Sequence, residues 1–198
     1  MDRRQAIQRA AVVLGYSISA PAIMGILKGC KATPEIGYKP VFFNPDQAAV
    51  MAEVAEIIIP KTETPGAKET GVPAFMDLML KDCYGPEDQK RFLEGVTALD
   101  AEAEKSFGNG FMDCSPEQQK ELVQRIHSEA IASVRSQNPP KERPFILMAK
   151  ELTMLGFFTS EAGATQVLNY VPVPGSYQGC VQVGTTINGV EVGRTWAL

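Results

Sequence analysis

The distribution of prolines and glycines is the feature that most constrains how this 198-residue chain folds. These residues interrupt the stretch 44–168 several times, and between the interruptions apolar residues recur at helical spacing. Two segments, Asn44–Gln47 and Ser115–Gln118, begin alike, with a capping residue, a proline at the first helical position and a capping-box glutamine. The pattern predicts an all-α fold.

We expect a compact domain of five to six helices over residues 44–168, followed by an extended, mostly irregular arm at 169–198. A tether at 30–43 precedes the domain, because the two prolines and the glycine in that segment oppose regular structure. The expected helices cover residues 44–59, 74–82, 86–107, 115–134, 144–158 and 160–168.

The segment 144–158 is the most apolar of these helices, and its apolar residues go nearly all the way round it. Such a helix is either central to a core or shares one face with a partner. For a domain of this size we expect a mixture of both. The candidate partner contacts on this helix are Phe145, Leu152, Phe157 and Phe158.

The character of the chain changes in the arm at 169–198, which is rich in glycine and has no helical period. The dipeptide Asn188-Gly189 predicts a small hairpin there. The arm is suited to lie along another protein, and the alternative is a strap around its own helices. Its candidate anchors to a partner are Tyr170, Tyr177 and Trp196.

Residues 1–29 have the pattern of an export signal. A basic head containing Arg3 and Arg4 precedes an uncharged run from Ala10 to Leu27, and small residues follow. The paired arginines suit a twin-arginine signal, the type that exports already folded proteins. A general secretory signal is one alternative. An uncleaved membrane anchor is another, although the run makes a short and poor span.

The four cysteines agree with export. Leu27–Cys30 resembles a bacterial lipobox, in which Cys30 would be lipidated as a membrane tether, but Lys28 departs from the usual small residue, so both outcomes stay open. Cys83 and Cys114 flank one expected helix and are a candidate intrachain disulfide, which leaves Cys180 as the odd cysteine. The alternative is that all three are free thiols.

Composition and motifs narrow the function further. Residues 1–29 hold four of the 19 basic and one of the 23 acidic residues, so the remainder carries 15 against 22 and a net charge of −7. That balance, without any basic block, argues against nucleic-acid binding. The chain has one histidine, His127, no CxxC or CxxCH, no phosphate-binding glycine loop and no GxSxG. We expect no catalytic, cofactor-binding or metal-binding residues.

Two long runs carry a family resemblance: AEIIIPKTETPGAKETGVPAFMDLML at 55–80 and TMLGFFTSEAGATQVLNYVPVPGSYQGC at 153–180. With them, the chain from about residue 41 to residue 184 resembles the gluconate 2-dehydrogenase subunit 3 family. The resemblance implies the small, non-catalytic subunit of a periplasmic or membrane-associated dehydrogenase, of gluconate 2-dehydrogenase-like or glycoside 3-dehydrogenase-like type. The substrate does not transfer with it.

The resemblance also implies partners. In such complexes a large flavoprotein of the glucose–methanol–choline (GMC) oxidoreductase type holds FAD, and a cytochrome c subunit often takes the electrons. The small subunit lends its twin-arginine signal to the large one, which would explain an export signal for folded proteins on a chain without a cofactor. In similar complexes a late cysteine is bridged to the large subunit, and Cys180 matches that position.

Two other classes of function stay open from the sequence. One is a free-standing exported lipoprotein that binds a ligand or scaffold without an enzyme partner. The weaker one is an oxidoreductase that uses its own thiols, which would need a cysteine of depressed pKa.

Overall fold

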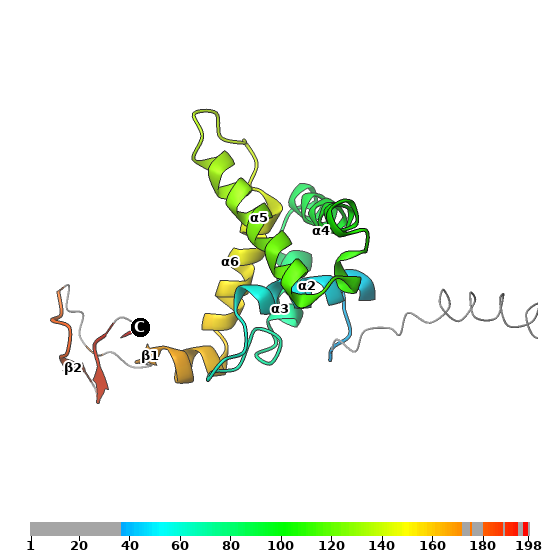
Figure 1. Ribbon diagram of the computed structural model, residues 1–198. Coiled ribbons are helices and arrows are strands. Elements are labelled where there is room, and N and C mark those ends of the chain that lie inside the picture. The colour runs from blue at the N-terminus through cyan, green and yellow to red at the C-terminus, as the bar shows by residue number, and fades with distance from the viewer. Residues whose placement is uncertain (1–36, 172–174, 176–179, 188, 194–195, 198) are drawn as a thin grey trace, which may run out of the picture. The chain divides into compact units, whose positions relative to one another are not determined.

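The computed structural model describes residues 37–171, 175, 180–187, 189–193 and 196–197, and this part of the chain is mostly α-helical, as predicted (Figure 1). Among the described residues, five α-helices are followed by a turn of π-helix and four two-residue strands, with one turn of 3₁₀-helix between α4 and α5. The elements are α2 (Pro45–Ile58), α3 (Val72–Cys83), α4 (Pro86–Phe107), η1 (Phe111–Asp113), α5 (Pro116–Val134), α6 (Phe145–Phe158), η2 (Gly163–Val167), β1 (Asn169–Tyr170), β2 (Thr186–Ile187), β3 (Val190–Glu191) and β4 (Trp196–Ala197).

Helix boundaries follow the local chemistry of the sequence. Both predicted capping boxes are present: the side chain of Asn44 accepts from the amide of Gln47, and that of Ser115 accepts from the amide of Gln118. Four of the five α-helices carry proline in the first turn, where the missing amide costs no hydrogen bond. Gly108 ends α4 with a φ of 76°, a left-handed conformation that suits glycine.

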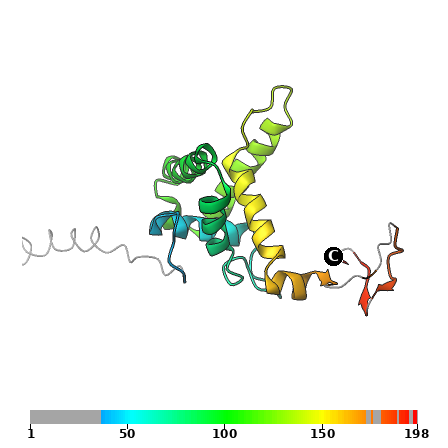
Figure 2. The same cartoon turned by 180° about the vertical axis from the view of Figure 1, so that it is seen from behind.

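Helix α6 is the centre of the packing. It contacts α2, α3, α4 and α5, and Figure 2 shows it running across the helical unit from the α5–α6 loop to η2. Its buried side chains meet a core built by every other α-helix, which explains why its apolar residues surround it. The largest fully buried side chains in this core are Met51, Met76, Leu80, Phe92, Leu99, Phe111, Leu122, Ile146 and Leu152.

The arm is more organised than the sequence indicates. The expected helix at 160–168 is mainly a π-helical turn, η2. The predicted hairpin is present, with β2 antiparallel to β3. Strand β1 also pairs in parallel with β4, so the first and last described residues of the arm lie side by side. Two valines of the arm, Val171 and Val192, are buried.

Candidate functional site

The partner contacts predicted on α6 divide into two groups. Leu152 and Phe157 are only 1% and 2% exposed and belong to the core of this chain, so they are not available to a partner. The prediction for these two residues is corrected: on a helix buried on most sides, an apolar side chain is more often core than interface. The apolar side chains that α6 does leave in solvent are those of Met154 and Leu155.

Phe145 and Phe158 are partly buried against the core. The ring of Phe145 lies edge-on to that of Phe92, with 4.9 Å between centroids. It also lies directly over Gly95 of α4, where an added Cβ would come within 2.3 Å of the Phe145 Cβ. Glycine at 95 therefore lets α4 and α6 approach closely. Phe145 contacts α4 of its own chain.

The arm presents the remaining candidate contacts. Tyr170 is 43% exposed on β1, and Cys180 is an exposed free thiol. Trp196 lies on β4, opposite Asn169 in the register of the parallel pair. Tyr177, Arg3, Arg4 and Cys30 lie outside the described residues. The arm thus brings Tyr170 close in space to the strand of Trp196, although 26 positions separate them in sequence.

The candidate disulfide between Cys83 and Cys114 is not formed, and both residues are free thiols. Cys83 is exposed at the end of α3, whereas Cys114 is buried in the core with its thiol near the carbonyl oxygen of Asn109, at 3.7 Å. Burial, together with the charges of Asp113 and Asp100, raises the pKa of the Cys114 thiol. A buried thiol of raised pKa is a poor nucleophile, the opposite of what thiol chemistry needs.

A buried carboxylate that sequence reasoning missed fixes the entry of the chain into the helical unit. Asp77 of α3 is 1% exposed and accepts hydrogen bonds from three consecutive backbone amides, those of Val41 (2.7 Å), Phe42 (3.1 Å) and Phe43 (2.7 Å). Burial, with a contribution from Asp77, raises the pKa of the nearby Tyr38 hydroxyl to about 12. The signal was an aspartate inside the otherwise apolar run VPAFMDLML.

A second carboxylate, Glu56, organises the loop between α2 and α3. It accepts from the amides of Lys61 (3.0 Å) and Lys68 (2.9 Å), so the loop closes around it. An added Cβ at Gly66 would lie 2.2 Å from Glu56 Oε1, so a larger residue there would have to displace the Glu56 carboxylate. Ion pairs of Lys61 with Glu69 and of Lys68 with Glu53 lie on the outer side of this loop. The segment PKTETPGAK (60–68) therefore has a structural role, as a loop that closes around Glu56.

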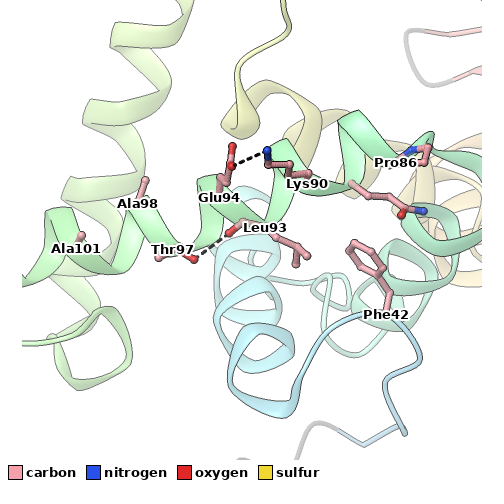
Figure 3. Close-up of a pocket in the computed structure, with 9 residues that line it drawn as sticks. Phe42, Pro86, Lys90, Leu93, Glu94, Thr97, Ala98 and Ala101 are labelled. Carbon is pink, nitrogen blue, oxygen red and sulfur yellow. Dashed lines mark hydrogen bonds and ion pairs between the residues drawn. The ribbon is translucent and has the colours of Figure 1, made fainter.

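A groove of about 670 Å³ runs along the outer face of α4. Figure 3 shows Phe42 reaching toward α4 beside Leu93, with the small side chains of Ala98 and Ala101 farther along the helix. An ion pair between Lys90 and Glu94 borders the apolar floor. The groove exposes an apolar strip. Phe42 forms one wall of the groove, and the backbone amide of Phe42 is held by its hydrogen bond to Asp77.

His127, the single histidine, lies on α5 with its Nε2 atom 3.2 Å from the Nζ atom of Lys150 on α6. Burial lowers the pKa of His127, and the positive charge of Lys150 lowers it further. Because an ammonium can only donate, the imidazole nitrogen accepts, and the neutral ring carries its proton on Nδ1. No carboxylate orients this histidine among the described contacts, so nothing there resembles a catalytic dyad.

In the described ranges, no group of three or more histidine, cysteine, aspartate or glutamate side chains is arranged to hold a metal ion. No helix in the same part of the chain is both long and apolar enough to cross a membrane.

Comparison with curated proteins and with solved structures gives no significant match. The family model described as gluconate 2-dehydrogenase subunit 3 matches residues 45–175. The match begins at the first residue of α2 and extends past β1 to residue 175, so it includes Glu56 with its loop, Asp77 and the central helix α6. It covers well over half of the sequence, and the chain therefore belongs to the gluconate 2-dehydrogenase subunit 3 family.

Proposed function

We propose that this chain is the non-catalytic small subunit of an FAD-dependent dehydrogenase complex and that it escorts and stabilises a large flavoprotein subunit of the GMC type. The observation that carries the proposal is the family match over residues 45–175, because that family is a subunit of a dehydrogenase complex. The substrate class follows the partner: a sugar, a sugar acid or a glycoside. A cytochrome c subunit is the proposed electron acceptor.

The proposed contact with the large subunit uses side chains that the fold leaves exposed. On the helical unit these are Met154 and Leu155 of α6, which are 43% and 44% exposed. On the arm they are Tyr170 and the thiol of Cys180. Large apolar and aromatic side chains that gain burial on association supply most of the affinity of an interface. An exposed thiol on an irregular segment is also accessible to a cysteine of another chain.

The proposed export route assigns a role to residues 1–29. In this proposal Arg3 and Arg4 form the twin-arginine signal, and the folded flavoprotein crosses the membrane bound to this chain. The complex then resides in the periplasm or at the membrane, with Cys30 as the candidate lipid anchor. The FAD belongs to the partner, which explains why an exported chain of this kind needs the route for folded proteins.

Export of both subunits tests the escort role. The Arg3→Lys, Arg4→Lys double variant is expected to leave this chain and the flavoprotein together in the cytoplasm, whereas Arg9→Lys in the same leader is the matched control and leaves export intact. Fractionation with antibodies to both proteins measures the outcome. If the flavoprotein still reaches the periplasm when this chain is retained, the escort role is wrong.

The thiol of Cys180 has its own test. Non-reducing electrophoresis of the assembled complex is expected to show a band that joins the two subunits, which disappears in Cys180→Ser. Cys83→Ser is the matched control, because Cys83 is also an exposed free thiol but lies on α3. A joined band that survives Cys180→Ser, or no such band in the unaltered complex, contradicts the proposed bridge.

A further inference from the structure

A cavity of about 170 Å³ lies where the end of α2 meets α5 and α6. It is separate from the α4 groove and from the arm. Its apolar walls are Ile57 and Ile58 from α2, Val123 from α5 and Ile146 from α6. Val123 and Ile146 are 4% and 2% exposed, so the inner wall is firmly part of the core, whereas the isoleucines of α2 are only partly buried.

Two of the three polar side chains that line this cavity contact each other. Gln124, His127 and Lys150 line it, and Lys150 Nζ donates to His127 Nε2 at 3.2 Å. Among the described residues, none forms an ion pair with Lys150, in contrast to Arg143 and Glu151 nearby on the chain, which pair with each other at 2.8 Å. The ammonium carries three N–H groups and the imidazole uses one of them, so the others remain for a ligand.

We propose that this cavity binds a small monocarboxylate with an apolar body. Lys150 would donate to the carboxylate, and the isoleucine and valine walls would enclose the hydrocarbon part. The volume fits this chemistry, because an apolar cavity of about 150 Å³ is large enough for benzene. Small-molecule sites commonly have this form, with mostly apolar walls and a few convergent polar groups.

The same walls exclude other classes of ligand. A cation would meet the ammonium of Lys150, and a polyhydroxylated sugar acid would leave its hydroxyl groups against hydrocarbon without hydrogen-bond partners. A doubly charged phosphate would have a single lysine to neutralise it. The site is therefore distinct in chemistry from any sugar or sugar-acid substrate of the partner enzyme, and the inference stands independently of the proposed function.

Matched pairs of small molecules test the site on the purified full chain. Benzoate and hexanoate are the probes, and benzyl alcohol and hexanol are their uncharged counterparts. Isothermal titration calorimetry is expected to give a dissociation constant below about 10 mM for at least one carboxylate, as a partly enclosed ligand of this size allows. Its alcohol should bind at least about tenfold more weakly, as expected when a charge-assisted hydrogen bond is lost. Whether benzoate or hexanoate binds more tightly distinguishes a flat ligand from a flexible one.

Lys150→Met removes the positive charge and keeps most of the side-chain volume, so it tests whether Lys150 binds the carboxylate. It is expected to weaken carboxylate binding by about tenfold or more and to leave alcohol binding unchanged. Lys120→Met, on the exposed face of α5, is the control and should bind as the unaltered chain does. NMR chemical-shift changes should centre on His127 and Lys150. No binding at 10 mM probe (about the weakest affinity expected), equal binding of acid and alcohol, or shift changes centred elsewhere would each overturn the site, and none of these needs the variant to fold.

Discussion

The helical unit and the arm of this protein use opposite means to hold their shape. In the helices, a continuous core of buried side chains joins the α-helices α2 to α6, and α6 lies at its centre. In the described part of the arm, four two-residue strands are held by backbone hydrogen bonds, with Val171 and Val192 as the buried apolar side chains. A two-residue ladder with so little burial is marginal alone.

Folding stability and the side chains available for contact with another protein are located in different regions of the molecule. Burial of apolar surface stabilises the helices, and their polar anchors, Asp77 and Glu56, are occupied with backbone amides. The arm keeps Tyr170, Val183 and Cys180 in solvent, where association could bury them. We therefore expect substitutions in the helices to change folding and substitutions in the arm to change assembly.

The largest expected effect is that of Leu152→Ala. Leu152 is 1% exposed at the centre of the core, so its truncation should lower the free energy of unfolding by about 4 kcal/mol. Leu155→Ala is the matched control on the same helix, since Leu155 is 44% exposed, and it should change stability by less than about 0.5 kcal/mol. Urea unfolding followed by circular dichroism measures both. Equal losses would show that α6 is not the centre of the core.

Asp77→Ala should have the next largest effect, a loss of about 3 kcal/mol, because three amides lose a charged acceptor and water replaces it only in part. Asp82→Ala, in the last turn of the same helix but exposed, is the control and should be nearly neutral. Denaturant unfolding gives the values, and hydrogen exchange at the amides of Val41 and Phe43 should accelerate. Unchanged exchange there would contradict the anchoring role.

Val192→Ala tests the arm. It removes two buried methyl groups and should destabilise the arm by about 1 kcal/mol without changing the unfolding of the helices. Hydrogen exchange should accelerate at the amides of Gly184 and Val192, which bond to the carbonyls of Val192 and Thr185 at 2.8 Å each. If the free energy of unfolding of the helices falls by as much as the free energy of opening of the arm, the two regions fold as one unit. That result would contradict the comparison.

The last prediction concerns Tyr38, whose effect on stability changes only at alkaline pH. The folded state raises the pKa of this hydroxyl from 10.0 to about 12, so the folded state holds its proton more tightly than the unfolded state. Stability from this group is complete below pH 10 and is lost as the pH rises toward 12. Unfolding measured against pH should show this loss in the unaltered chain and a weaker one in Tyr38→Phe. Identical profiles would contradict the burial of Tyr38 beside Asp77.

The sequence predicted what local chemistry determines. Both capping boxes, the proline starts and the Asn188-Gly189 hairpin follow from adjacent residues, and the structure confirms the helices and the hairpin. The sequence did not predict that Leu152 and Phe157 belong to the core. The sequence pattern of an apolar helix is the same whether the helix packs against its own chain or against a partner. The pairing of Asn169 with Trp196 and the contacts of Asp77 join residues distant in sequence, and no local pattern encodes them.

The central claim is that this chain acts as the small subunit of a flavoprotein complex. The most direct measurement is gentle affinity purification of the chain, tagged after Leu198, from the cells that produce it, followed by an absorbance spectrum and by mass spectrometry. We expect a stoichiometric larger subunit with bound FAD, visible as a flavin absorbance band. Recovery of the chain alone, with no flavin absorbance and no GMC-type protein, would contradict it.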